Sequence, residues 1–202
     1  MGAFVIGIGG GSASGKSTIA EEVSRRLAPL AVQVINQDRF FWDAARLPRH
    51  ANRASTRVWP DHNHPSSFDA AGLRSALREA REGGADVVIA EGILVLWDRE
   101  ARELMDLKVF VEADADERIV RRIRRNLAAG GDLDAVCDFY LDSVRYRHRE
   151  FCQPTRAWAD VVVPGGQDEA DRREEALGEV CRQVWAASRG PRAGGPAPRD
   201  EG

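Results

Sequence analysis

The stretch from Gly10 to Ser17 limits the fold of this protein more than any other part of the sequence. It reads Gly-Gly-Ser-Ala-Ser-Gly-Lys-Ser and fits the pattern G-x-x-x-x-G-K-[ST]. An apolar run at 4–8 predicts a buried strand before it, and the segment 17–27 predicts a helix after it. A glycine-rich turn that binds nothing would rarely match both the motif and its flanks. The stretch therefore predicts a loop that holds the phosphates of a nucleotide.

The residue types in this loop suit phosphate binding. Glycines let backbone N–H groups turn toward phosphate oxygens, while Lys16 is expected at the outer phosphates and the Ser17 hydroxyl on Mg²⁺. The sequence contains only two lysines, Lys16 and Lys108, among many arginines. A compact ammonium group fits between phosphates where a planar guanidinium does not, which favours a specific role for Lys16. The predicted nucleotide-binding residues here are Gly10, Gly11, Ser12, Ala13, Ser14, Gly15, Lys16, Ser17 and Thr18.

Length and composition narrow the class of protein. With 202 residues we expect one domain at 1–187 and a disordered Gly/Pro/Arg-rich tail at 188–202. A net charge of -3 disfavours a general nucleic-acid binder. No apolar run has the length of a membrane span and no signal sequence is evident, so we expect a soluble, cytoplasmic protein without a membrane partner. The three cysteines form no CxxC pair and are interpreted as ordinary thiols.

Strand and helix patterns alternate along the chain. Strands are predicted at 4–8, 32–35, 86–90, 107–111 and 161–163, and helices at 17–27, 68–82, 99–105, 114–127, 133–151 and 168–187. Such alternation is typical of an α/β protein, so we predict a three-layer fold with a mostly parallel sheet flanked by helices.

Two acids follow predicted strands and are therefore expected at the same edge of the sheet. Asp38 is the candidate base that takes the proton from an acceptor hydroxyl, and it is also a candidate Mg²⁺ ligand; a helix cap or ion pair is the alternative. Glu91 ends an apolar strand and is a second candidate metal carboxylate; its alternative is a structural acid bonded to loop amides.

Two further segments are candidates for ligand contact. The helix at 114–127 carries five arginines on one face, which favours a lid that clamps phosphates over a solvated helix. The segment 39–67 has little periodicity but many aromatic residues, which is typical of a binding loop. His62 and His64 are interpreted as loop histidines that contact the substrate or solvent, and not as metal ligands. Each aromatic residue here could instead belong to the core.

Several motifs in the same order resemble the uridine kinase family, which is related to phosphoribulokinase and nicotinamide riboside kinase. They lie at 9–17, 36–41 (Asn-Gln-Asp-Arg-Phe-Phe), 64–69 (His-Pro-Ser-Ser-Phe-Asp), 91–94 (Glu-Gly-Ile-Leu), 111–118 and 150–164. The resemblance implies ATP and Mg²⁺ as cofactors, Asp38 with Lys16 in catalysis, and Ser17, Asp38 and Glu91 around the metal. It also places Arg121, Arg122 and Arg125 in the lid. Uridine kinases are often oligomeric, so a homo-oligomer is compatible with it.

The sequence departs from this family where the pyrimidine is bound. The family has a β-hairpin between the helix after His-Pro and the Glu-Gly-Ile strand, but here a helix and a strand use all of 70–90. The family's acid before His-Pro is Asn63, the Arg-Gly-Arg-Asp stretch is Ala-Gly-Gly-Asp at 129–132, and an expected glutamine is Phe139. The candidate acceptor-binding residues are Asp38, Phe40, Trp59, Asp61, His64, Phe68 and Arg125.

The sequence therefore predicts a kinase that transfers the γ-phosphate of ATP to a primary hydroxyl of a small molecule. A nucleoside 5′-hydroxyl is the expected acceptor by resemblance, and another nucleoside, a sugar or a specialised metabolite is the alternative. A non-catalytic ATP-binding regulator and, less favoured, a nucleic-acid end kinase are the other functions compatible with the residues.

Overall fold

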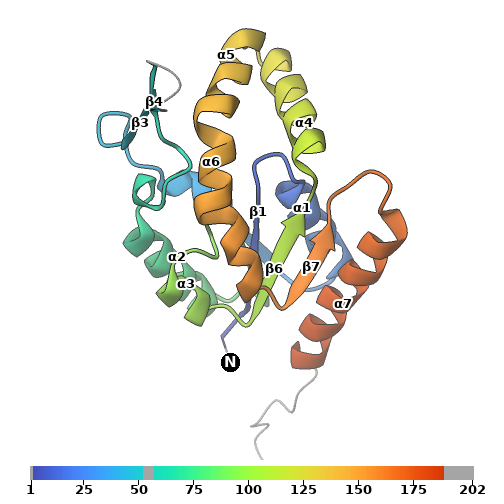
Figure 1. Cartoon of the computed structure of the whole chain (residues 1–202). Helices are drawn as coiled ribbons and strands as arrows, with labels where there is room; N and C mark the ends of the chain where they lie inside the picture. Colours follow the sequence, from blue (N-terminus) through green and yellow to red (C-terminus); the bar gives the residue numbers. More distant parts are fainter. Residues whose placement is uncertain (1, 52–56, 189–202) are drawn as a thin grey trace, which may run out of the picture.

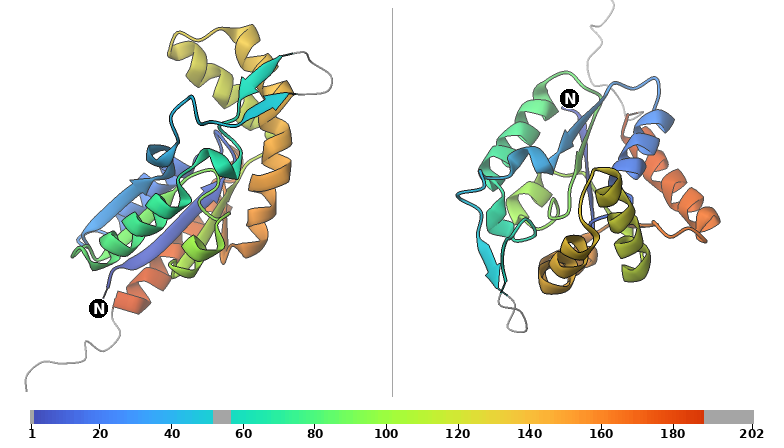
Figure 2. Two further views of the ribbon diagram at one scale, coloured as in Figure 1. Left: turned by 90° about the vertical axis from the view of Figure 1, so that its left-hand side faces the viewer. Right: turned by 90° about the horizontal axis from the view of Figure 1, so that it is seen from above.

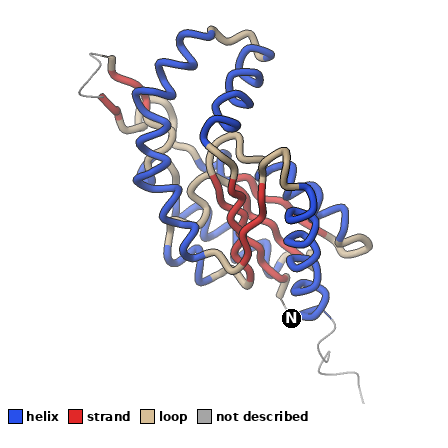
Figure 3. The backbone as a smooth tube through the Cα atoms, turned by 45° about the vertical axis from the view of Figure 1, so that its right-hand side comes forward, coloured by secondary structure: helices blue, strands red, loops and turns tan. Residues whose placement is uncertain are grey.

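A computed structural model describes residues 2–51 and 57–188, and these residues build a central sheet between two layers of helices (Figures 1 and 3). The sheet has the order β2-β5-β1-β6-β7, and its neighbouring strands pair in parallel. Its strands are β1 (Phe4–Gly10), β2 (Val32–Asn36), β5 (Val87–Glu91), β6 (Leu107–Glu112) and β7 (Val161–Pro164). The predicted α/β fold with a parallel, helix-flanked sheet is confirmed.

Strand side chains alternate between two separate cores, as the period of two in a strand requires. On one face, Val5 and Val88 pack in a cluster with the helix α2 (Ala70–Glu82) and α3 (Arg99–Glu103). On the other face, Ile6 and Ile89 pack with α1 (Lys16–Arg26) and α7 (Ala170–Ser188). Both faces of β1 and β5 are fully covered, which explains why these strands read as continuous apolar runs in the sequence.

Two helical segments extend above the carboxyl ends of the strands, of which one rises away from the sheet and the other runs back down beside it (Figure 1). The first is α4 (Ala115–Ala128), and the second is a nearly continuous helix predicted at 133–151. It comprises α5 (Leu133–Phe139), a π-helical turn at Tyr140–Val144, α6 (Arg145–Arg147), a second π-helical turn at His148–Cys152 and a 3₁₀ segment at Gln153–Trp158. The helical backbone thus extends seven residues beyond the predicted end. This segment is called the returning helix below.

The described parts of the segment 39–67, residues 39–51 and 57–67, contain more regular secondary structure than the sequence predicts. They include a small antiparallel hairpin of β3 (Arg49–Ala51) and β4 (Val58–Pro60), which lies beside the upper part of the returning helix (Figure 2). Two 3₁₀ turns, Gln37–Phe40 and Pro65–Ser67, flank it. These strands are three residues long, too short to produce an alternating pattern, so sequence periodicity missed them.

Between α2 and β5 the chain makes only a short turn, so the structure bears out the expectation that no hairpin lies between these elements. The expected disorder at 188–202 concerns residues that, apart from Ser188 at the end of α7, lie outside the described part of the chain. Within the described ranges no helix is both long and apolar enough to cross a membrane.

Candidate active site

The loop between β1 and α1 has the backbone that a phosphate cradle needs. Gly10, Ala13 and Gly15 have positive φ angles of 144°, 63° and 104°. A Cβ at Gly10 would lie 2.4 Å from the carbonyl oxygen of Val111, so only glycine fits there. At Gly15 the surrounding space is open, and glycine is required by the backbone angle alone. The turn ends directly at the first residue of α1, where the backbone N–H groups of the helix start are available to an anion.

Lys16 lies across this loop. Its side chain is 9% exposed, and Nζ donates a hydrogen bond to the carbonyl oxygen of Gly11 at 3.1 Å. Burial lowers the pKa of Lys16, and the nearby charges of Glu91 and Asp38 act in the opposite direction. The ammonium group is therefore largely removed from water and is held close to two carboxylates and the phosphate cradle.

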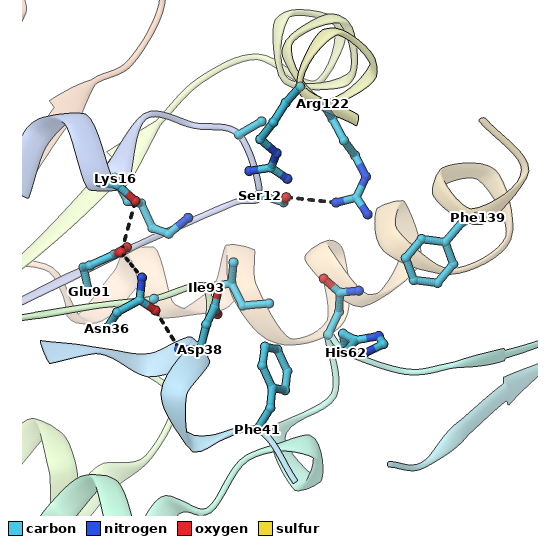
Figure 4. A pocket seen from close by; sticks show the side chains of 15 residues that line it. Ser12, Lys16, Asn36, Asp38, Phe41, His62, Glu91, Ile93, Arg122 and Phe139 are labelled. Carbon is cyan, nitrogen blue, oxygen red and sulfur yellow. Dashed lines mark hydrogen bonds between the residues drawn. The ribbon is translucent and has the colours of Figure 1, made fainter. Parts of the chain in front are cut away.

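A chain of hydrogen bonds links the loop to the two candidate acids (Figure 4). Ser17 Oγ and Asn36 Nδ2 both donate to Oε1 of Glu91, at 3.0 and 2.7 Å, and the backbone N–H of Asp38 donates to Asn36 Oδ1 at 2.7 Å. The strand register explains this meeting, because Asn36 and Glu91 are partners on β2 and β5. Glu91 itself is 5% exposed.

The side-chain oxygens at this point suit a magnesium ion. Hydroxyl and carboxylate oxygens are the protein ligands that Mg²⁺ prefers, and Ser17, Glu91 and Asp38 bring them to one place. In residues 2–51 and 57–188, no group of three or more His, Cys, Asp or Glu side chains is placed to hold a metal ion. A Mg²⁺ ion here would thus complete its shell with water and nucleotide phosphates, as this ion commonly does.

A cavity of about 260 Å³ opens beside these groups (Figure 4). It is lined by Ser12, Ala13, Lys16, Ser17, Asn36, Asp38, Phe41, His62, Asn63, Glu91, Gly92, Ile93, Arg122, Arg125 and Phe139. Lys16 and Glu91 lie at one end of the view in Figure 4 and Phe139 at the other. The cavity thus extends from the phosphate cradle to a wall that contains aromatic side chains.

Two of the three predicted lid arginines reach this cavity. Arg122 donates from Nη1 to Ser12 Oγ at 2.9 Å, and Arg125 also lines the cavity. Burial, with the neighbouring charge of Arg125, lowers the pKa of Arg122, and its Nε is a buried donor without a hydrogen-bond acceptor. A buried N–H donor of this kind is expected to be stabilised by an anion that accepts its hydrogen bond. Arg121 instead pairs with Glu117 of its own helix at 2.9 Å and does not line the cavity.

Most of the candidate acceptor-binding side chains lie elsewhere. Phe68 is buried and stacks on Phe41 with 4.2 Å between ring centroids. Phe40 and Phe41 both pack against the same core, and of the two only Phe41 also lines the cavity. Asp61 is completely buried and pairs with Arg147 at 2.6 Å. The ring of His64 caps the following turn by accepting from Ser66 N at 3.1 Å.

Trp59 also lies outside the cavity lining; its indole Nε1 donates to Asp142 at 3.1 Å. Of the candidate acceptor-binding residues, the structure brings Asp38 and Arg125 into the cavity wall. His62, interpreted from the sequence as a loop histidine that contacts substrate or solvent, lies there too. Phe41, Asn63, Ile93 and Phe139 also line the cavity, although the sequence analysis did not select them as acceptor contacts. The sequence signal that could have identified two of these residues was the departure from the family pattern at Asn63 and Phe139.

Comparisons with known proteins agree with this geometry. Residues 60–170 match the phosphoribulokinase / uridine kinase family. A uridine kinase of Brevibacillus brevis is 37% identical over 80% of this chain and 85% of its own length, and that of Deinococcus deserti is 38% identical over 82% and 90%. The chain belongs to the phosphoribulokinase / uridine kinase family. As a member it is a phosphotransferase with an alcohol group as acceptor.

A solved structure supports the fold of this family member. A protein from Silicibacter sp. TM1040, assigned as a fructose transport system kinase, superposes with a TM-score of 0.62 at 21% identity and covers 81% of this chain and 90% of its own. At this identity the likeness concerns the fold. The family match spans Glu91 and the lid arginines, and the phosphate loop lies before the matched residues.

Proposed function

We propose that this kinase transfers the γ-phosphate of ATP to the 5′-hydroxyl of a nucleoside, within one domain formed by residues 1–187. The observation that carries the proposal is the meeting of Ser17, Glu91, Asn36 and Asp38 beside Lys16, at the mouth of a phosphate cradle. The named uridine kinases that share 34–38% of their residues with this chain support the nucleoside as the acceptor.

In this proposal the loop at Gly10–Thr18 binds the phosphates through backbone N–H groups, and Lys16 moves from Gly11 to the outer phosphates. Arg122 and Arg125 neutralise charge on the transferred group from the lid side. Arg121 would join them only by leaving Glu117. Ser17, Glu91 and Asp38 would hold Mg²⁺, which supplies further charge neutralisation when bound.

Asp38 accepts the proton of the acceptor hydroxyl as the oxygen attacks phosphorus, and the bond between the γ-phosphorus and the bridging oxygen of ADP breaks. Asp38 suits this role because its side chain lines the cavity between the cradle and the aromatic wall, while its backbone is fixed by Asn36. Attack in line then depends on how the acceptor is held by the remaining cavity wall.

The test is ATP consumption with Mg²⁺ across uridine, cytidine, purine nucleosides, nicotinamide riboside and free sugars, with mass spectrometry of each product. We expect a phosphate monoester of a nucleoside. Transfer to a sugar or another metabolite alone would retain the catalytic roles and overturn the acceptor. ATP binding without transfer to any acceptor would favour the non-catalytic regulator, and transfer only to oligonucleotides would favour an end kinase.

A further inference from the structure

The hairpin β3–β4 is fastened to the returning helix by several side chains. The Trp59 indole donates to Asp142 Oδ2 at 3.1 Å, and His50 Nε2 donates to the backbone carbonyl of Asp142 at 2.9 Å. Arg57 pairs with Asp138 one turn earlier. Asp142 of the returning helix thus accepts one hydrogen bond from each strand of the hairpin. The hairpin and the returning helix lie side by side in the views of Figure 2.

Trp59 also packs against Phe139, a residue of the cavity wall. Its ring packs against Phe139 with 5.3 Å between centroids and a tilt of 53°. Phe139 in turn lies 5.5 Å from the guanidinium of Arg122, which bonds to Ser12 in the phosphate loop. Of these residues Phe139, Arg122 and Ser12 line the cavity, and Trp59 acts only from behind.

The end of the cavity at Phe139 differs chemically from the phosphate end. Among the described lining residues the carboxylates are Asp38 and Glu91, both close to Lys16. Away from Glu91 the lining includes Phe139, Phe41 and Ile93, and its polar groups are the amide of Asn63, the ring of His62 and the guanidinium of Arg122, which lies 5.5 Å from the ring of Phe139. Such a wall fits a flat ring with few hydrogen-bonding groups better than a polyol, whose hydroxyls would lose their water without enough partners.

We propose that Phe139 binds the flat, non-reacting part of the acceptor and that Trp59, held by Asp142, positions Phe139 for this contact. The hairpin β3–β4 is then a specificity element of this chain. The inference rests on the proposed function and makes it more specific. The acceptor is a nucleoside that is recognised through contact with the face of its base, and not a free sugar. Phe139 contacts the substrate, whereas Trp59 is a positioning residue.

The first experiment compares uridine with methyl β-D-ribofuranoside, which keeps the ribose and its primary alcohol but lacks the base. In the wild-type protein kcat/KM should favour uridine. Phe139→Gln should reduce this preference about tenfold, the size expected for one lost contact between a base and an aromatic ring. Phe139→Tyr keeps the ring and should keep the preference. Leu141→Gln, an exposed position on the same helix, is the matched control.

The outcomes separate the two proposals. A wild-type protein that phosphorylates no nucleoside would overturn the proposed function and this inference with it. A wild-type protein that phosphorylates uridine, with Phe139→Gln showing the same preference over the riboside, would overturn the inference alone. The KM for ATP serves as an internal reference, because a general loss of structure would raise it as well.

The second experiment is a double-mutant cycle on the attachment. Trp59→Phe keeps a ring against Phe139 but loses the donor to Asp142, and Asp142→Ala removes the acceptor. Each should raise the KM for uridine about threefold with kcat nearly unchanged, and the double variant should be no worse than either alone. Additive effects, or equal effects on the KM for ATP, would show that Trp59 does not act through Asp142 on the acceptor site.

Discussion

Ser17 and Glu91 are 74 positions apart in the sequence, yet the hydroxyl of Ser17 donates to a carboxylate oxygen of Glu91 at 3.0 Å. The bond joins the start of α1 to the end of β5, two neighbouring βα units of the sheet. It holds two oxygen donors at one point beside the phosphate cradle, where a divalent cation would bind.

Glu91→Gln keeps an oxygen that can accept from Ser17 and Asn36 but removes the negative charge. We expect the Mg²⁺ concentration for half-maximal activity to rise on the order of tenfold or more, because a neutral amide is a much poorer ligand for this cation. Titration of activity with Mg²⁺ at saturating ATP measures this. An unchanged Mg²⁺ requirement would restrict Glu91 to its structural hydrogen bonds.

Asp38→Asn should lower kcat by about 10²–10⁴-fold while nucleotide binding is retained, because the amide cannot accept the proton of the acceptor hydroxyl. The backbone bond from Asp38 to Asn36 does not involve the side chain and should survive the change. Steady-state kinetics and calorimetric titration with ATP provide the two measurements. Full turnover in this variant would remove Asp38 from the catalytic step.

Lys16→Met should abolish transfer and stabilise the ligand-free protein. Burial lowers the pKa of Lys16, which means that the folded protein disfavours its charged form. Replacing it with an apolar side chain of similar length should raise the free energy of unfolding by about 1 kcal/mol, or the melting temperature by about 2–4 °C. Scanning calorimetry without nucleotide tests this, and a lower melting temperature would contradict it.

His148 should make the stability of the protein depend on pH. Burial and the positive charge of Arg118 lower the pKa of His148 from 6.5 to about 4. Between these values the unfolded chain binds the proton and the folded one does not, so stability is lost as the pH falls from 6.5 toward 4. From this residue we expect a loss of about 2 kcal/mol between pH 7 and pH 5.

Urea unfolding of the wild type and His148→Gln at these two pH values measures the contribution. The variant should lose less stability than the wild type on acidification, because glutamine has no proton to bind. An equal loss in both proteins would assign the acid sensitivity to other groups.

Asp61→Ala should destabilise the fold more than it weakens acceptor binding. Asp61 is fully buried and pairs with Arg147, itself largely buried, so its removal should cost about 3 kcal/mol in the free energy of unfolding. Asp138→Ala breaks the exposed pair with Arg57 and should cost less than about 1 kcal/mol. Chemical denaturation of both variants compares them. A raised KM for the acceptor with unchanged stability would instead support the sequence-based assignment of Asp61.

Local patterns explain which parts of the molecule the sequence predicts well. The phosphate loop and the strands β1 and β5 are defined by residues close together in the chain, because glycine positions and apolar runs act through the local backbone. Asp38 and Glu91 could be placed at one sheet edge for the same reason, since Glu91 ends a strand, Asp38 closely follows another, and parallel strands end on the same side.

The walls of the cavity depended on contacts that no local pattern encodes. Asp61 and Arg147 are 86 positions apart, and Trp59 and Asp142 are 83 apart, so their pairing follows only from the docking of 49–51 and 57–67 on the returning helix. That docking turns Trp59 and Asp61 away from the cavity and leaves Phe139 in its wall. The sequence by itself determined the fold class and the phosphate chemistry, because both rest on short-range backbone geometry. Only the tertiary structure decided which side chains line the cavity, because that choice is made by packing between distant segments.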